Sequence, residues 1–356
     1  MAVLNEEQEM LRDMAREWTT NESPVTEWRK VRATGEQQAW DTSVYGTMAK
    51  MGWTGVVIPE EHGGSDFGWL SAGLVVEELG KTLTASPLIA STIAASAIIL
   101  GGSDEQKTEW LPKLASGEVV ATLAVDEGAR HDPSQVKTVV SNGKVSGTKK
   151  FVHEAHGAHL FVVAAKDGVY LVPAGDGMTL HDRKLADMRN HADVVFDNAG
   201  AEKLADGGED LLDKVLDRAR ILTACEMLGM AQQVFDTTLD YLKQRRQFNQ
   251  VLATFQALQH RMADLFADLA LMRSAVEGGL QALDTGFRTS HAATMAKAEA
   301  NRVLHLVSRE GIQLHGGIGM TDEYDIGFYL KRARVLEASF GNTGYLKDHF
   351  ATLSGY

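Results

Sequence analysis

The spacing of apolar residues changes twice along this chain, and this change limits the possible folds more than any other feature. Residues 1 to about 115 repeat at helical spacing, residues 116–208 alternate with a period of two, and residues 209–356 return to helical spacing. Asn-Gly and Asp-Gly turns separate the short β-rich runs in the middle, as expected for a small all-β domain. The sequence therefore predicts an α+β protein with three domains, 1–115, 116–208 and 209–356.

The third domain contains long amphipathic runs joined by short connections. Such helices bury their apolar faces against one another, which favours a helical bundle. We expect its helices at 211–245, 252–283, 290–315 and 324–339.

Composition and charge exclude several classes of protein. The 356 residues are 44% hydrophobic and 23% charged, which is typical of a soluble globular protein. A net charge of −13 disfavours binding to nucleic acid or to anionic membranes. The single cysteine, Cys225, fits a reducing environment, and we expect a cytoplasmic protein. Because Cys225 lies on an apolar helix face, we expect a core residue rather than a nucleophile.

Two motifs in the third domain suggest ligand contacts. The first, YLKQRRQFNQVLATFQALQHRMAD, starts at Tyr241 and places Arg245 at a helix end, before a turn at Phe248. A basic residue there either offsets the helix dipole or binds phosphate, and the residues alone leave both open. In the second, a helix ends at Gly316-Gly317, where the backbone can approach a ligand without side chains in the way.

In this order, the first motif and the later Gln-Leu-His-Gly-Gly-Ile-Gly-Met-Thr resemble the acyl-CoA dehydrogenase family. The likeness extends over essentially the whole chain, including the segments 52–64 and 149–152. It implies an N-terminal helical domain, a central small β-barrel domain and a C-terminal four-helix bundle. It also implies a flavoprotein oxidoreductase with FAD as cofactor, which desaturates an acyl-CoA thioester in the catabolism of fatty acids or steroids.

The resemblance further implies that FAD is shared between two subunits. In relatives a neighbouring subunit supplies an arginine, a phenylalanine and a Gln-x-x-Gly-Gly turn to the diphosphate and adenine end of FAD. The matching residues here are Arg245, Phe248, Gln313, Gly316 and Gly317. All five are present, so this half of the site is kept.

The half of the site that surrounds the flavin ring departs from the family pattern. Residues 125–132, VDEGARHD, stand where relatives have Thr-Glu-Pro-x-Ala-Gly-Ser-Asp, and His131 replaces a small residue beside the cofactor and the thioester. Phe151 and His153 replace the tryptophan and threonine of a Trp-Ile-Thr-Asn motif. We expect Phe151 to lie against the flavin and His153 to donate a hydrogen bond in place of threonine. His153 and His156 lack zinc-motif spacing, so no metal is expected.

Asp217 and Arg220 match a helical pair that faces the acyl-CoA in relatives, where the arginine reaches the adenosine-phosphate part, although from the residues alone a surface ion pair is the better explanation. The reaction also needs a carboxylate that removes the α-proton of the thioester. The two family positions for this glutamate hold Phe340 and Ala219 here. Glu337, one helical turn before Phe340, is the nearest candidate.

The altered base positions leave three hypotheses. The pattern favours a partner subunit that completes the FAD site of a paralogous chain in a hetero-oligomer, such as a heterotetramer of two plus two chains. A homodimeric or homotetrameric dehydrogenase with a non-standard base is the first alternative. A flavin-dependent monooxygenase of the same superfamily is the second. For either dehydrogenase, the resemblance implies an electron-transfer flavoprotein as acceptor.

Overall fold

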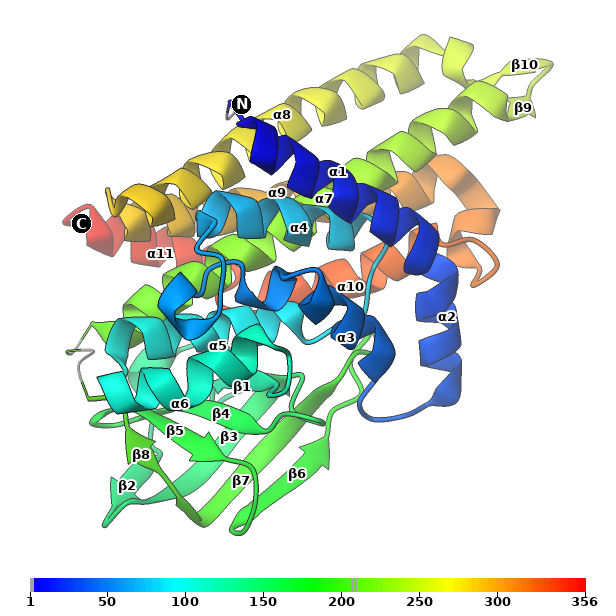
Figure 1. Ribbon diagram of the computed structural model, residues 1–356. Coiled ribbons are helices and arrows are strands. Elements are labelled where there is room, and N and C mark those ends of the chain that lie inside the picture. Colours follow the sequence, from blue (N-terminus) through cyan, green and yellow to red (C-terminus); the bar gives the residue numbers. More distant parts are fainter. Residues whose placement is uncertain (1–2, 206–207, 209) are drawn as a thin grey trace. The chain divides into compact units, whose positions relative to one another are not determined.

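The structure of the chain is a computed structural model that describes residues 3–205, 208 and 210–356 (Figure 1). It divides into two compact units. We call them the bundle unit (Met1–Glu27, Gly73–Thr84 and Arg220–Tyr356) and the sheet unit (Trp28–Ala72 and Ala85–Ala219). The division runs through three helices, α2 (Val25–Thr34), α4 (Gly68–Lys81) and α7 (Leu211–Gln244).

The first third of the chain is helical, as the spacing of its apolar residues predicts. Its other helices are α1 (Glu6–Glu22), α3 (Thr42–Lys50), α5 (Leu88–Gly101) and α6 (Asp104–Ala115). Helix α6 begins with a capping box, because the Ser103 hydroxyl accepts from the Gln106 N–H and the Gln106 side chain accepts from the Ser103 N–H. Helix α5 is apolar nearly all round and is buried against α6 and β1 of the sheet unit.

The middle of the chain forms two four-stranded sheets in the sheet unit. Their strands are β1 (Ala121–Ala124), β2 (Val139–Ser141), β3 (Lys144–His153), β4 (Leu160–Ala165), β5 (Gly168–Pro173), β6 (Met178–Asp182), β7 (His191–Gly200) and β8 (Glu202–Lys203). One sheet has the order β1-β4-β5-β8 and the other β2-β3-β7-β6. Only β1 and β4 pair in parallel among the described strands of the two sheets.

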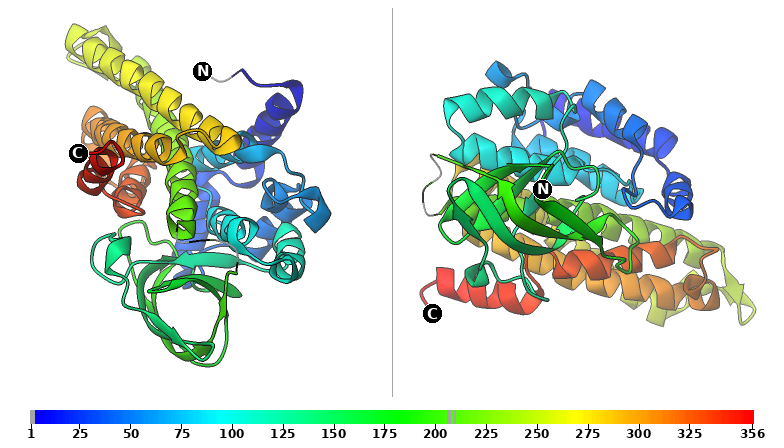
Figure 2. Two further views of the ribbon diagram at one scale, coloured as in Figure 1. Left: turned by 90° about the vertical axis from the view of Figure 1, so that its left-hand side faces the viewer. Right: turned by 90° about the horizontal axis from the view of Figure 1, so that it is seen from below.

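The two sheets share one apolar core. Phe161 on β4 meets Phe196 on β7 edge to face, with ring centroids 6.2 Å apart. Figure 2 shows the strands curving round a common interior. The β2–β3 hairpin turns at Asn142 and Gly143, whose φ angles of 50° and 69° are those of the predicted tight turn.

The bundle unit contains the long helices of the C-terminal half. These are α8 (Gln256–Thr285), α9 (Thr289–His315), α10 (Ile326–Ala338) and α11 (Thr343–Leu353), together with the part of α7 from Arg220 onward. Helix α9 packs against α8, α10 and α11 (Figure 1). The separate helix α11 was not distinguished from the sequence.

Two glycines allow α4 and α7 to cross closely inside the bundle unit. A Cβ at Gly229 would lie 1.9 Å from the Glu77 carbonyl oxygen, and one at Gly80 would lie 2.3 Å from that of Glu226. No side chain fits at either position, so the backbones touch directly. Within residues 3–205 and 210–356, no helix is both long and apolar enough to cross a membrane.

Candidate functional site

The predicted diphosphate contacts lie at the ends of two helices of the bundle unit. Arg245 follows α7 and leads into a short hairpin of β9 (Arg246–Gln247) and β10 (Gln250–Val251). Phe248 and Asn249 form its turn with φ angles of 52° and 63°. Asn249 adopts this positive φ without difficulty, because asparagine tolerates it better than most residues. The Phe248 side chain is 83% exposed, so it is available to another molecule.

The Gly316-Gly317 turn is open. Helix α9 ends at His315, and Gly316 has a φ of 66°. A Cβ added at Gly316 or Gly317 would meet no atom within 4 Å, and both residues are exposed, as is Gln313 one turn earlier. An incoming ligand can reach this backbone directly.

An aromatic cluster, Tyr241–His315–Tyr324, connects the two helix ends. Tyr241 lies on α7, one turn before Arg245, and its hydroxyl donates to the His315 carbonyl at 3.3 Å. The Tyr241 and His315 rings are stacked with centroids 4.3 Å apart, and Tyr324 lies 4.8 Å from His315. Sequence reasoning missed Tyr241 and Tyr324. The only available signal was the spacing of four residues from Tyr241 to Arg245.

His315 is a packing residue in this cluster. It is 3% exposed, and its Nδ1 donates to the Gly311 carbonyl at 2.7 Å. Burial lowers the pKa of His315, so the ring is neutral at neutral pH. The packed ring therefore holds His315, the residue that directly precedes the Gly316-Gly317 turn.

In the sheet unit, the segment after β1 is held by a buried lysine. The Lys149 ammonium donates to the Val125 carbonyl at 2.9 Å and to Glu127 Oε1 at 2.7 Å. Burial opposes ionisation of Glu127, but the hydrogen bonds from Lys149 and from Thr138 outweigh it and lower its pKa to about 2. The Val125 side chain has no hydroxyl to offer a ligand, and its backbone carbonyl already accepts from Lys149.

His131 lies in the same segment and is 7% exposed. Its Nδ1 is 2.9 Å from Asp126 Oδ1. The histidine predicted beside the thioester is thus engaged with an acidic residue of its own segment, and its substrate contact stays a prediction.

Phe151 and His153 lie at the end of β3. Phe151 has a φ of 54°, its N–H donates to Asp193 Oδ1 at 3.2 Å, and the Arg183 guanidinium lies 6.0 Å from its ring centroid. His153 meets His191 edge to face at 4.6 Å. The two predicted ring-side residues are close to one end of the same sheet, and their flavin contacts stay predictions.

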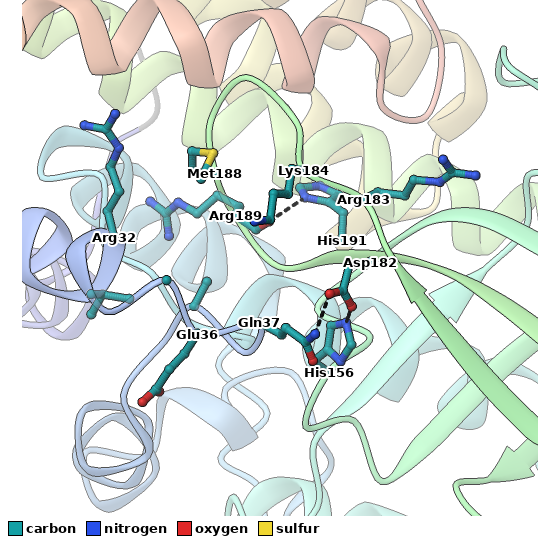
Figure 3. A pocket seen from close by; sticks show the side chains of 13 residues that line it. Arg32, Glu36, Gln37, His156, Asp182, Arg183, Lys184, Met188, Arg189 and His191 are labelled. Atoms are coloured by element: carbon teal, nitrogen blue, oxygen red, sulfur yellow. Dashed lines mark hydrogen bonds and ion pairs between the residues drawn. The ribbon is translucent and has the colours of Figure 1, made fainter.

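A pocket in the sheet unit borders these residues, because Arg183 and His191 also line it (Figure 3). Figure 3 shows Arg32 and Arg189 on one side and Asp182 with His156 on the other. The Asp182 carboxylate pairs with His156 Nε2 at 2.8 Å. The other lining residues are Val31, Gly35, Glu36, Gln37, Ala39, Lys184 and Met188.

Ala219 and Phe340, the residues expected at the two positions of the family base, are both held within the fold. Ala219 is buried on α7. Phe340 follows α10 with a φ of 55°, and Gly341 follows it with a φ of 122°. The Arg220 Nε donates to the Phe340 carbonyl at 3.2 Å, and Asn301 Nδ2 donates to the Gly341 carbonyl at 3.2 Å.

The interpretation of Asp217 and Arg220 as a surface ion pair is wrong. Each side chain is 1% exposed, so both are part of the interior. Because Arg220 contacts the turn that carries Phe340, its structural role is clear, whereas its contact with acyl-CoA stays a prediction.

Glu337 is engaged with neighbouring side chains. Its Oε2 lies 3.1 Å from Arg334 Nη1 and 3.2 Å from His305 Nδ1.

No group of three or more possible metal ligands occurs in the described part of the chain. Cys225 is buried, and burial raises the pKa of its thiol, in agreement with a core role.

Comparisons with known proteins decide the family. The family model described as acyl-CoA dehydrogenase, N-terminal domain, matches residues 5–118, and the one described as acyl-CoA dehydrogenase, C-terminal domain, matches residues 206–352. The probable acyl-CoA dehydrogenase YngJ of Bacillus subtilis is 30% identical over 96% of this chain and 96% of its own length. The chain belongs to the acyl-CoA dehydrogenase family.

Two further relatives agree. The acyl-CoA dehydrogenase IpdE2 of Mycolicibacterium smegmatis is 31% identical over 93% of each chain. A solved structure named as the Tcur3481-Tcur3483 steroid ACAD variant has a TM-score of 0.92 and 28% identity, and covers 98% of each chain. The predicted order of helical domain, β domain and helical bundle, the oxidoreductase class and FAD as the family cofactor are confirmed.

The residues of this acyl-CoA dehydrogenase fit the diphosphate end of FAD. Arginine binds phosphate well, and the bundle unit offers an exposed arginine at a helix end and an exposed glycine turn that no side chain covers. The Gly316 N–H itself donates to the Ile312 and Gln313 carbonyls, which leaves Gly317 as the candidate backbone donor. Arg245 forms no ion pair with another residue in the part of the chain that the structure describes. In the segment expected on the ring side, Glu127 is bonded to Lys149 and Thr138, and Asp126 contacts His131.

Proposed function

We propose that this chain is one subunit of a hetero-oligomeric acyl-CoA dehydrogenase and completes a FAD site that a paralogous subunit shares. The observation that carries the proposal is a contrast within the bundle unit. The diphosphate residues are exposed and open, whereas the position of the usual base holds Phe340 in a turn bonded from inside the fold. A chain of this kind supplies cofactor contacts and leaves proton removal to its partner.

Different residues of this chain would contact different parts of the cofactor and the substrate. Arg245 would offer a charge-assisted hydrogen bond to a phosphate, and Gly317 would offer its backbone N–H, since the Gly316 N–H already donates to the Ile312 and Gln313 carbonyls. Phe248 offers an exposed aromatic face beside them. When bound, FAD supplies the acceptor for the hydride that leaves the β-carbon of the acyl-CoA. Asp217 and Arg220 are proposed to face the acyl-CoA, with Arg220 towards its adenosine-phosphate part, and His131 is proposed to lie near the thioester.

The names of the relatives support a paired assembly and a bulky substrate. The solved relative is named as a pair of proteins and as a steroid ACAD. We therefore propose a steroid-derived or fatty acyl-CoA as the substrate class. An electron-transfer flavoprotein is the proposed acceptor, and the cytoplasm the proposed location.

The homo-oligomeric alternative is favoured by one observation, the presence of Glu337 one turn before the base position. Its carboxylate is already paired with Arg334, which argues against it as the base. No feature of the structure specifically favours the monooxygenase alternative.

Expression of the chain alone tests the proposal. We expect a colourless protein that becomes yellow and oxidises acyl-CoA with a dye acceptor only when a paralogous subunit is co-expressed. Tightly bound FAD in the chain alone, bleached by an acyl-CoA, would contradict the hetero-oligomeric assembly.

The cofactor contact has its own test. In the assembled enzyme, Arg245→Ala should weaken FAD binding by roughly 1.5–3 kcal/mol, because a charge-assisted hydrogen bond is lost. The matched control is Arg246→Ala, at the neighbouring exposed arginine, and it should change FAD affinity little. Equal FAD affinities of the Arg245→Ala variant and the unmodified enzyme, measured by flavin fluorescence titration, would reject the assignment.

A further inference from the structure

We infer that Tyr241 is a positioning residue for the FAD diphosphate half-site: it holds the end of α7, which carries Arg245, against the Gly316-Gly317 turn at the end of α9. The inference rests on the proposed function, because it takes Arg245 and the turn as the two sides of one phosphate site. It adds a residue that does not itself contact the cofactor and acts through both sides at once.

The contacts of Tyr241 carry this inference. Its backbone carbonyl accepts from the Arg245 N–H at 2.8 Å, so it belongs to the last turn of α7. Its hydroxyl donates across the unit to the carbonyl of His315, which is 74 residues away and directly precedes Gly316. The Tyr241 side chain therefore joins the last turn of α7, which leads to Arg245, to His315, which directly precedes the glycine turn.

The position of the turn also depends on how the His315 ring is held. That ring cannot rotate freely, because it is buried and its Nδ1 is bonded to the Gly311 carbonyl at 2.7 Å. Tyr241 stacks on it with an interplanar angle of 28°, and Tyr324 contacts it from another direction at 44°. Aromatic packing of this kind defines the relative position of the rings and thus of their helices.

Such a connection is needed because helix ends are weakly held. The last carbonyls of a helix have no partner within the helix, and its last turn frays unless another group binds there. Arg245 and Gly316 both follow such a last turn. A phosphate site built from two separate helix ends requires a fixed distance between them, and the Tyr241 hydroxyl and ring provide the described link.

The test compares two tyrosine-to-phenylalanine variants in the FAD-binding assembly as purified. Tyr241→Phe removes the hydroxyl contact with the His315 carbonyl and keeps the stacked ring. Tyr329→Phe is the matched control, because the buried Tyr329 hydroxyl donates to the Lys81 carbonyl at 2.5 Å elsewhere in the same unit. Apoprotein is titrated with FAD, and flavin fluorescence reports the Kd.

We expect Tyr241→Phe to raise the Kd for FAD roughly threefold to tenfold, the usual effect of one lost neutral hydrogen bond, and Tyr329→Phe to leave it unchanged. Hydrogen exchange supplies a second readout that needs no cofactor. The amides of Gly316 and Gly317 should exchange faster in Tyr241→Phe than in Tyr329→Phe.

The outcomes separate this inference from the proposed function. If Arg245→Ala weakens FAD binding but Tyr241→Phe changes neither the Kd nor the exchange of the turn, the inference is wrong and the half-site stands. If Tyr241→Phe and Tyr329→Phe lose FAD affinity equally, Tyr241 is only a general stabilising residue. That result would overturn the inference as well. If none of the three variants affects FAD, the half-site assignment itself fails.

Discussion

Arg220 Nε donates a hydrogen bond to the backbone carbonyl of Phe340 at 3.2 Å, across 120 residues of sequence. The arginine is 1% exposed, and its guanidinium also lies 5.8 Å from the centroid of the Tyr345 ring. A charged side chain so deeply buried is kept only when its donors are used. The turn that carries Phe340, the residue expected at the position of the family base, is therefore held from inside the bundle unit.

Replacement of Arg220 should therefore destabilise the bundle unit. Arg220→Met removes the donor and leaves the partly buried Phe340 carbonyl without it, at a cost of about 1–3 kcal/mol. Urea unfolding midpoints measure the effect. The control is Arg302→Met, because Arg302 is half exposed and pairs with Asp268 at the surface, a type of pair that contributes little. Equal midpoints for the two variants would show that the Phe340 contact has no stabilising role.

Lys297 predicts a dependence of stability on pH. Its ammonium is fully buried and donates to Asn301 Oδ1 at 2.6 Å and to the Leu336 carbonyl at 2.9 Å. Burial lowers its pKa to about 7 from the usual 10.5, while the Glu337 charge acts against this shift and Arg220 adds to it. Between these two values the unfolded chain holds the proton that the folded chain releases. The free energy of unfolding should therefore rise with pH from about 7 to 10.5.

This rise should reach about 1.4 kcal/mol per pH unit and disappear below the folded pKa, where both states are protonated. Lys297→Met should abolish this contribution, which is measured as the difference between the unfolding curves of the two proteins at several pH values. Lys331→Met is the control, since Lys331 lies half exposed on α10 and pairs with Asp322. Curves for Lys297→Met that run parallel to those of the unmodified protein would contradict the burial of a neutral amine.

The long helices could be predicted from the sequence, because their apolar residues repeat over many turns. Helix α9 was expected at 290–315 and is Thr289–His315. The buried polar contacts could not be predicted in this way. A charged residue such as Arg220 or Lys297 in an amphipathic run is normally placed on the solvent side, since such residues are rarely buried. The carbonyl groups that accept their hydrogen bonds are distant in sequence, and only folding places them close by.

In the candidate site, too, local features could be predicted from the sequence and long-range contacts could not. Arg245 and the Gly316-Gly317 turn could be found from local spacing, since a motif contains them. Tyr241 could not, because its contact with His315 joins two helices that are far apart in sequence. The ring-side residues were recognised as departures from a pattern, but the sequence did not reveal that Lys149 and Glu127 hold each other there.

The pair of Lys149 and Glu127 predicts a loss of stability in acid. The folded pKa of Glu127 is about 2 against a usual 4.5, so its stabilising effect is present above pH 4.5 and is lost as the pH falls towards 2. Glu127→Gln should remove this acid-dependent step. It should also cost about 3 kcal/mol at neutral pH, because it leaves the buried Lys149 without its carboxylate. Urea midpoints at pH 7, 4 and 3 test both effects, with the exposed Glu118→Gln as control.

Glu337 gives the sharpest test of where the base resides. If the partner subunit removes the α-proton, Glu337→Gln should slow turnover by the assembled enzyme less than about threefold, since loss of a general base typically slows a reaction about a hundredfold or more. Glutamine keeps the size of the side chain and loses only the charge that pairs with Arg334 and His305. A small loss of stability is expected from that pair, so turnover must be measured below the unfolding temperature of the variant. If turnover instead falls about a hundredfold or more with FAD still bound, the base belongs to this chain and the homo-oligomeric enzyme is favoured.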